Sequence, residues 1–287
     1  MSGFATWRAL VDAQLLSGAE HYTTFRKVPS QPTVANVWTD LSINSGTGNP
    51  IPNYYASSPL ISATFVSNEG LFHGTPVSPA KKYLSRMMIT MAPTGTPLPM
   101  TFTLCDYLLY YPFVDMDNTD PQLLTNSVAL PRYSDGLNVK LMMISHTTYA
   151  GGQTFQISYT NENGVAGRTT PLLTVNTAGN AYSAVAGGPV AYSNGPFIPL
   201  QQGDLGIRSV ESIQFNAPGG GLCALVLVVP LATMALRGVD APSERDFFTE
   251  TPSMPQIQDG AYLNFVGCPT GSIANVPLFG DATFVWE

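Results

Sequence analysis

The sequence predicts a mainly β protein: an antiparallel, jelly-roll-like β-sandwich with a short N-terminal helix and an extended arm. Three features predict this class: apolar runs of strand length, many turn-forming residues and little charge. The 287-residue chain has 26 glycines and 24 prolines, and 11% of its residues are charged, against about 25% in an average globular protein. Hydrophobic residues make up 44% of the chain, which excludes general disorder because a core can form.

The most apolar run, residues 222–229, defines the centre of the predicted sheet. It follows three consecutive glycines at 219–221. Before these glycines, Ile213 and Phe215 alternate with polar residues, which is the period of a strand exposed on one face. A half-exposed strand, a glycine turn and a fully buried strand together predict a β-hairpin.

A membrane span is the alternative interpretation of this run, because apolar residues continue from Leu222 to Leu236. The stretch is shorter than the roughly 20 residues that a bilayer requires, and Pro230 interrupts it. We therefore expect a core strand of a soluble protein and no membrane partner.

The N-terminal region, residues 1–60, is predicted to hold the helix and the extended arm, and residues 61–287 the β-sandwich, as one or two subdomains. Thr6 can cap a helix that Gly18 ends. The apolar face of this helix is formed by Trp7, Leu10, Val11 and Leu15. A helix of about a dozen residues is marginal alone, so it docks either on its own domain or on a neighbouring subunit. The prediction to test is that Trp7, Leu10 and Val11 form a subunit interface.

Further strands follow from alternating or continuous apolar residues between turn signals. They are expected at residues 61–66, 71–73, 83–91, 100–111, 137–144 and 155–159, and again in the C-terminal segment 261–286. The small and polar residues of 176–194 predict a mobile surface loop. The charged, proline-containing segment 237–259 predicts a connecting excursion, and no fixed repeat indicates a solenoid.

Catalytic residues leave no clear pattern in this sequence. The histidines lie far apart and lack the spacing of paired metal ligands: His21, His73 and His146. The cysteines are odd in number and are predicted to be reduced thiols in a protein made in a cytosol: Cys105, Cys223 and Cys268. We therefore predict that the protein is not an enzyme and needs no cofactor.

The strongest local candidate for a ligand is the loop with Asp115, Asp117 and Asp120, since three carboxylates in six residues could bind Ca²⁺. The EF-hand pattern requires glycine where Asp120 stands and glutamate where Asn126 stands. A solvated loop capped by Asp and Asn side chains is the default, and the ion alternative stays open. Tyrosines at 54–55 and within 107–111 are expected to pack inside the fold, with sugar stacking or an interface as alternatives.

The charge of the chain argues against nucleic acid as a partner. The net charge is −7 and the basic residues are scattered, whereas sequence-independent binding requires Lys and Arg to neutralise phosphates. The first residues lack a basic segment followed by an apolar one, so no cleaved secretion signal is expected. So little charge suits a surface that is partly covered by other subunits.

Five segments carry a resemblance to a known family. They are Trp38-Thr39-Asp40-Leu41-Ser42, Asn49-Pro50-Ile51-Pro52-Asn53-Tyr54-Tyr55-Ala56, Asp106-Tyr107-Leu108-Leu109-Tyr110-Tyr111-Pro112, Leu130-Pro131-Arg132-Tyr133 and Gly280-Asp281-Ala282-Thr283-Phe284-Val285-Trp286. These segments are similar to structural proteins encoded by tailed bacteriophages. The shared residues are of packing and turn types, so the resemblance implies a virion component and transfers no site residue.

The role within a virion follows from what the sequence lacks. A major capsid protein of the common tailed-phage type has a long spine helix, and a tail fibre has repeats or coiled-coil heptads; the sequence shows neither pattern. A compact β-sandwich with an N-terminal arm suits a non-enzymatic capsid cement or decoration protein that bridges subunits of the major capsid protein, expected as a trimer at three-fold or quasi-three-fold positions. It is expected in the virion after synthesis in the host cytoplasm. The alternatives are a receptor- or glycan-binding head or tail appendage, and a cryptic hydrolase.

Overall fold

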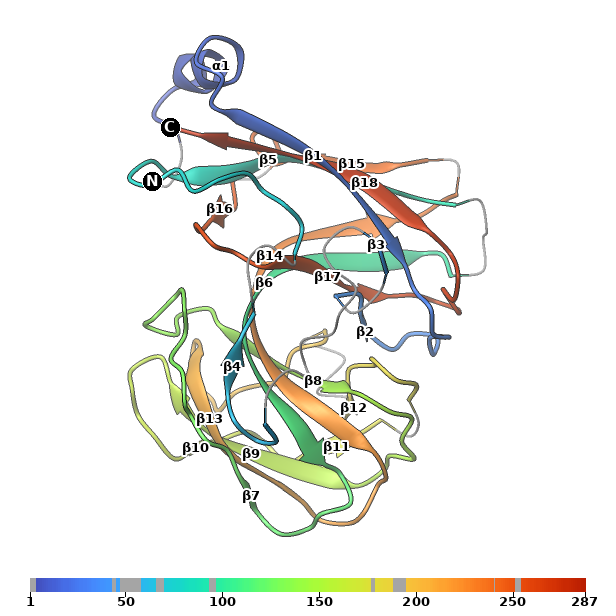
Figure 1. Cartoon of the computed structure of the whole chain (residues 1–287). Helices are drawn as coiled ribbons and strands as arrows, with labels where there is room; N and C mark the ends of the chain where they lie inside the picture. Colours follow the sequence, from blue (N-terminus) through green and yellow to red (C-terminus); the bar gives the residue numbers. More distant parts are fainter. Residues whose placement is uncertain are drawn as a thin grey trace.

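The computed structural model describes residues 4–42, 45–46, 58–65, 70–92, 97–176, 179–187, 195–239, 241–250 and 254–287. Within these residues the protein is mainly β, with one short helix, α1 (Trp7–Leu15). The strands form three antiparallel sheets, which we call the upper, central and lower sheets after their places in Figure 1. The predicted fold class is therefore confirmed.

The sheets have the following strand orders. The upper sheet runs β15 (Ser243–Asp246), β5 (Lys82–Met91), β18 (Leu278–Trp286), β1 (Glu20–Val28) and β3 (Ser45–Gly46), with β16 (Gln256–Ile257) also paired to β5. The central sheet runs β2 (Thr39–Asp40), β17 (Leu263–Cys268), β6 (Met100–Asp115), β14 (Leu222–Leu236) and β8 (Lys140–Ser145), with β4 (Ala63–Thr64) also paired to β6. The lower sheet runs β12 (Ala186–Gly187), β11 (Leu173–Val175), β9 (Thr154–Asn161), β13 (Ile207–Phe215) and β7 (Gln122–Leu123), with β10 (Arg168–Thr169) also paired to β9.

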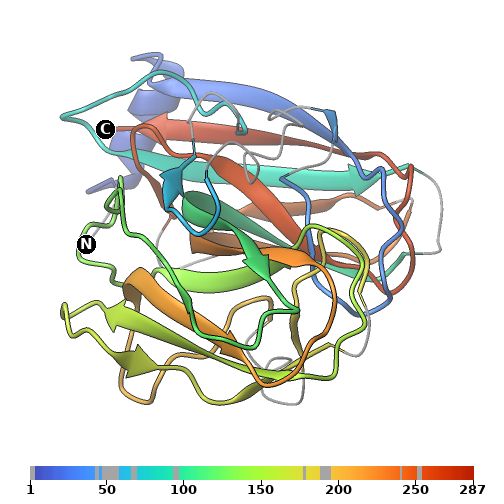
Figure 2. The same cartoon turned by 60° about the horizontal axis from the view of Figure 1, so that its bottom comes forward.

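Two long strands connect the halves of the molecule. β6 and β14 have 16 and 15 residues and pair along nearly their full lengths. They pass from the upper to the lower half through the middle of the fold (Figures 1 and 2). Leu104 and Met234 belong to the core against the upper sheet, whereas Leu109 and Leu225 belong to the core against the lower sheet. Two β-sandwiches therefore share one central sheet.

The continuous apolar sequence of β14 follows from burial on both of its faces. Every residue from Cys223 to Val228 is fully buried. Leu225 points into the core against the lower sheet, and Val226 into a separate cluster with Tyr107 and Tyr110. Over this stretch β14 lies between β6 and β8, so the predicted buried strand at the centre of a sheet is confirmed. In the described part of the chain, no helix is long and apolar enough to cross a membrane.

The predicted hairpin across the glycine turn is wrong. β13 pairs with β9 and β7 in the lower sheet, whereas β14 belongs to the central sheet. Phe215 and Leu225 instead share the core between these two sheets. When β13 and β14 belong to two stacked sheets, the apolar face of each strand is buried against the other sheet, as in a β-sandwich. Pairing them edge to edge in one sheet would leave these faces uncovered. Gly220 and Gly221, with φ of 73° and 89°, allow the chain to turn between the sheets.

The chain between α1 and the predicted arm forms a strand that the sequence analysis did not predict. Residues Glu20–Val28 form β1, which pairs with β18 along nearly its whole length. Its inward positions include Phe25 and Lys27, while Thr24 and Arg26 are exposed. This strand was not predicted because most of its residues are polar, and the sequence analysis relied on alternating or continuous apolar residues.

Some predicted strands are shorter or absent. The described residues 61–65 contain the short β4 as their one strand, and residues 71–73 form no strand, although the Leu71 amide donates to the Leu263 carbonyl at 2.7 Å. The excursion 237–259 contributes β15 and β16. Predictions for residues 49–56, 93–96 and 188–194, including the Tyr54-Tyr55 pair, fall outside the described residues.

The three cysteines are free, and two of them are inaccessible. Burial raises the pKa of the Cys105 and Cys223 thiols well above the usual range, and raises that of the partly buried Cys268 as well. Because the thiolate is the reactive form, we expect a thiol reagent at pH 8 to modify at most Cys268 in the native protein and all three cysteines after unfolding. Peptide mapping by mass spectrometry checks this, and rapid native modification of Cys105 or Cys223 would contradict it.

Candidate subunit interface

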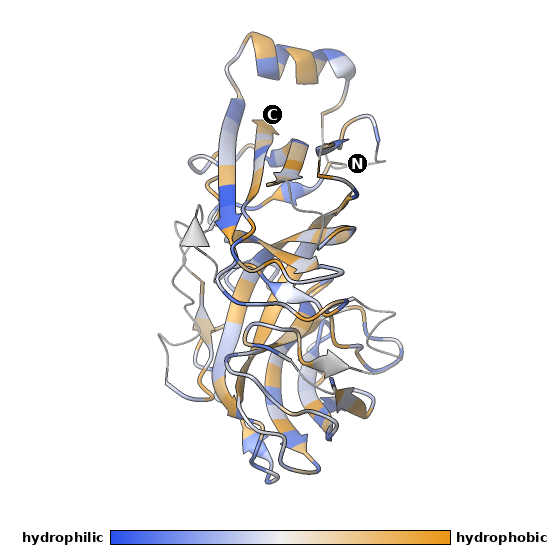
Figure 3. Ribbon diagram, turned by 90° about the vertical axis from the view of Figure 1, so that its right-hand side faces the viewer, coloured by the Kyte–Doolittle hydropathy of each residue, from blue (hydrophilic) through white to orange (hydrophobic). Residues whose placement is uncertain are grey.

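The helix α1 begins and ends where the sequence predicts. The Thr6 hydroxyl accepts a hydrogen bond from the Ala9 amide at 3.1 Å, which satisfies one of the free amides of the first turn. The helix ends at Leu15, and Gly18 follows with a φ of +63°, a conformation that favours glycine. Figure 3 shows α1 at one end of the elongated molecule, with hydrophobic residues along it.

The apolar residues of α1 are divided between the core of the chain and the solvent. Leu10 is 5% exposed and belongs to the core against the upper sheet. Trp7 is 63% exposed, Leu15 is 76% exposed and Leu16, which follows the helix, is 74% exposed. Val11 is exposed at 40%. The structure thus places Leu10 in its own domain and leaves Trp7 and Val11 at the surface.

A groove of about 340 Å³ lies between α1 and neighbouring parts of the upper sandwich. Trp7, Leu10 and Val11 form its helical wall. Phe248, which follows β15, stands against Trp7 with the ring centroids 3.9 Å apart at an interplanar angle of 68°. Phe248 could not be predicted from sequence as part of this groove, because it lies more than two hundred residues from the helix and within a charged segment.

The groove also has charged residues. Arg86 of β5 lines it and donates to Glu244 at 2.6 Å and to Asp281 at 2.8 Å. The pKa of the Arg86 guanidinium is raised above its ordinary value, mainly by the hydrogen bond to Glu244. Glu20 and Asp246 line the same groove. The surface beside α1 therefore combines an aromatic and aliphatic wall with charged groups, which is typical of a protein–protein contact with a polar rim.

Three of the segments that carry the phage resemblance, residues 38–42, 106–112 and 130–133, meet at the junction of the two sandwiches. The Tyr107 hydroxyl donates to Asp40 at 2.8 Å, and Asp40 also accepts from the amide and hydroxyl of Ser42, each at 2.8 Å. Arg132 binds Asp106 through two hydrogen bonds, at 2.6 and 2.9 Å. Three segments distant in sequence thus form one buried polar cluster, and their role in this structure is to hold the junction together. The sequence pattern did not reveal these contacts.

The histidines are integrated into the fold. His73 Nε2 lies 3.1 Å from the Ala261 carbonyl, and its Nδ1 lies 3.2 Å from the Lys82 ammonium. The carbonyl requires a donor, so Nε2 carries the proton and Nδ1 accepts from Lys82. Burial and the nearby Lys82 lower the pKa of His73 to about 4, and burial alone lowers that of His146 to about 4. Both rings are therefore neutral at pH 7.

The acidic loop uses its carboxylates as caps of the backbone. Asp115 Oδ1 accepts from the Asp117 amide at 2.9 Å, and Asp117 Oδ1 accepts from the Gly220 amide at 2.8 Å. Among the described residues, no group of three His, Cys, Asp or Glu side chains is arranged to hold a metal ion. The capped loop is the interpretation that these contacts support. Likewise, the tyrosines 107, 110 and 111 are buried within the fold.

Comparison with known proteins returns only weak similarity. No family model matches the chain, and no curated protein matches it. The structure of infectious bursal disease virus Gt strain has a TM-score of 0.17 at 6% identity, and covers 96% of this chain and 86% of that one. The crystal structure of the infectious bursal disease virus VP2 subviral particle has a TM-score of 0.15 at 9% identity, with the same coverage. Both neighbours come from infectious bursal disease virus, and scores this low support no conclusion about fold or function.

Proposed function

We propose that the protein is a non-enzymatic structural protein of a virion. More specifically, it is a capsid cement or decoration protein of a tailed phage that forms a homotrimer and bridges subunits of the major capsid protein. The exposed apolar surface of α1 is the observation that carries this proposal. The sequence resemblance supports the phage origin, and the low charge of the chain, 11%, suits a surface that other subunits cover.

The energetic argument concerns the outward side chains of α1. Trp7, Leu15 and Leu16 are each more than 60% exposed, so the isolated chain gains little from their apolar area. Burial against another subunit stabilises by about 1.5–3 kcal/mol for each large apolar side chain. Trp7, which stands against Phe248, and the two leucines at the end of the helix therefore offer exposed apolar area to a neighbouring chain.

The buried ionisable groups also fit a structural role. Asp106, Asp40 and Lys82 have hydrogen-bond partners within the fold. A perturbed pKa indicates a catalytic residue only where the group also faces a cleft. These groups are buried. Asp106 and Asp40 join segments distant in sequence through Arg132 and Tyr107, and Lys82 holds a nearby turn through the Thr75 carbonyl.

The trimer and its interface can be tested by light scattering after size-exclusion chromatography. We expect the wild-type protein to have three times the 30.7 kDa mass of the chain. Leu15→Ser combined with Leu16→Ser should shift the mass towards that of the monomer, because both side chains are exposed at more than 70%. Surface substitutions of this kind typically change stability by less than about 0.5 kcal/mol, so folding should be unaffected.

Leu10→Ala is the matched control on the same helix. Leu10 packs in its own core, so its truncation should lower the free energy of unfolding by about 2–5 kcal/mol and leave the oligomer mass unchanged below the melting temperature. Trp7→Ala should instead reduce assembly. A wild-type protein that stays monomeric at all concentrations, or variants with unchanged mass, would contradict the interface.

A further inference from the structure

The upper half of β14 has a free edge. β8 pairs with β14 from Cys223 to Val228 only. Beyond Pro230, β14 continues to Leu236 paired with β6 on one side, and in the described part of the chain no strand pairs with the other side. Unpaired backbone groups at a strand edge can bind a strand of another chain.

The direction of the backbone groups at this edge follows from two contacts of Thr233. The Thr233 carbonyl accepts from Arg245 of β15 at 2.6 Å, so it faces away from β6. The Thr233 and Thr103 hydroxyls lie 3.1 Å apart, as expected of a non-hydrogen-bonded pair, whose side chains approach closely. Such pairs alternate along an antiparallel ladder, so the amide and carbonyl of Ala235 face the same free edge.

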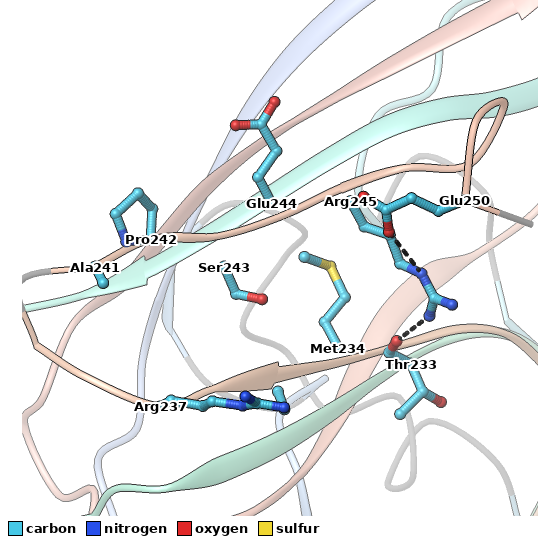
Figure 4. A pocket seen from close by; sticks show the side chains of 10 residues that line it. Thr233, Met234, Arg237, Ala241, Pro242, Ser243, Glu244, Arg245 and Glu250 are labelled. Atoms are coloured by element: carbon cyan, nitrogen blue, oxygen red, sulfur yellow. Dashed lines mark hydrogen bonds and ion pairs between the residues drawn. The ribbon is translucent and has the colours of Figure 1, made fainter.

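The edge borders a cavity large enough for a peptide segment. The cavity has a volume of about 470 Å³ and lies between β14 and β15, which belong to different sheets. Figure 4 shows Arg245 reaching across it from β15 to Thr233, with Glu250 beside its guanidinium. The volume is in the range of about 300–1,000 Å³ that small-molecule sites have. Arg245 thus caps one carbonyl that an incoming strand would otherwise bind.

The charges in this cavity favour an acidic partner. Glu244 is paired with Arg86 at 2.6 Å, and Glu250 lies 3.6 Å from Arg245. Arg237 is exposed, lines the same cavity, and makes no ion pair with any described residue. Its guanidinium presents a fork of donors that matches a carboxylate. An added strand would therefore place an Asp or Glu side chain opposite Arg237.

We infer that the free edge of β14 is a strand-addition site. It binds an extended segment of another protein, and Arg237 recognises an acidic side chain of that segment. In this binding mode the main chain supplies affinity and the alternate side chains supply specificity. The bound segment replaces the Arg245 contact at the Thr233 carbonyl and pairs with the backbone of Ala235. The inference does not depend on a virion role or on the α1 interface.

Two capped hexapeptides test this site on the full-length protein: Thr-Val-Glu-Val-Thr-Val, and the same peptide with Lys in place of Glu. The Glu peptide should bind, slow the amide exchange of Thr233 and Ala235 in NMR spectra, and bind about tenfold more tightly than the Lys peptide, since its carboxylate can form a charged hydrogen bond with Arg237. Ala235→Pro should abolish binding. It removes an outward amide, and proline is tolerated at such an edge position.

Arg237→Glu provides a second variant that does not depend on the folding of the proline variant, because Arg237 is exposed. It should reverse the preference towards the Lys peptide. Unchanged exchange of Thr233 and Ala235, or equal binding of both peptides to the wild type and to Arg237→Glu, would overturn the inference. So would self-association of an Arg245→Ser variant without peptide binding, because Arg245 would then serve only to block the edge.

Discussion

Replacing Arg132 with methionine is expected to lower the free energy of unfolding by about 3–5 kcal/mol, the typical cost of leaving one partner of a buried ion pair alone. Asp106 is fully buried and accepts from Arg132 at 2.6 and 2.9 Å and from the Tyr262 amide at 3.1 Å. Arg132 also donates to the Tyr107 carbonyl at 3.1 Å. The substitution removes three of these contacts at the junction of the two sandwiches.

Burial raises the pKa of Asp106, and Arg132 acts against this rise. Without Arg132, the carboxyl either stays charged in the core or takes up a proton at neutral pH, and both alternatives destabilise the native state. Urea unfolding of the purified variant measures the loss.

The exposed ion pair of Arg8 and Asp12 provides the control. Its side chains are 79% and 41% exposed, and such pairs contribute about 0–1 kcal/mol. Arg8→Met should therefore leave the unfolding midpoint nearly unchanged. If Arg132→Met and Arg8→Met had equal effects, the junction would not depend on the Asp106 contact.

Lowering the pH from 7 to 4.5 is expected to remove about 5 kcal/mol of stability through His73 and His146 together. Burial lowers the pKa of both rings from 6.5 to about 4 in the native state. A loss of this size is comparable with the whole stability of many domains, about 5–15 kcal/mol.

The sign follows from proton uptake. Between pH 6.5 and 4 the unfolded chain binds protons on both histidines while the native protein does not, so unfolding becomes easier as the pH falls. The contribution is fully present above pH 6.5 and is lost as the pH falls towards 4. Lys82, Arg132 and Asp259 act on His73, and of these the first two oppose its protonation. Arg168 lowers the pKa of Asp204 to about 2, so that carboxylate loses its contribution only at lower pH.

Unfolding curves at pH 7 and 4.5 for the wild type and for the double variant His73→Gln, His146→Gln isolate this effect. Glutamine can donate to the Ala261 carbonyl and accept from Lys82, as His73 does. The wild type should lose about 5 kcal/mol more than the variant over this pH range. Parallel losses in the two proteins would show that carboxylates, and not the histidines, set the acid stability.

The strands with strong apolar patterns could be predicted from the sequence, and their partners could not. Burial on one or both faces leaves alternating or continuous apolar residues, which located β9 and β14. The pairing of β13 with β9 instead of β14 depends on which apolar faces stack across the core, and a sequence does not state this. β1 stayed hidden because its exposed positions are polar and its inward positions include Lys27.

The same holds for the candidate interface: its helix could be predicted from the sequence, and its contacts with distant segments could not. Helical periodicity and the Thr6 cap located α1 and the face with Trp7 and Val11. The sequence analysis grouped Leu10 with Leu15, although residues five apart lie about 140° apart around a helix, and the structure buries Leu10 and exposes Leu15. Phe248 and the Asp106–Arg132 pair join segments distant in sequence, and contacts of this kind require the three-dimensional structure.

A cryo-EM map of the virion that contains this protein tests the central claim most directly. The account predicts density on the outside of the capsid, at three-fold or quasi-three-fold positions, that fits three copies of the double sandwich. It also predicts that α1 lies at the contact between copies or with the major capsid protein, with Trp7, Leu15 and Leu16 buried there. Absence of the protein from the particle, or density at the tail with α1 facing solvent, would contradict the account.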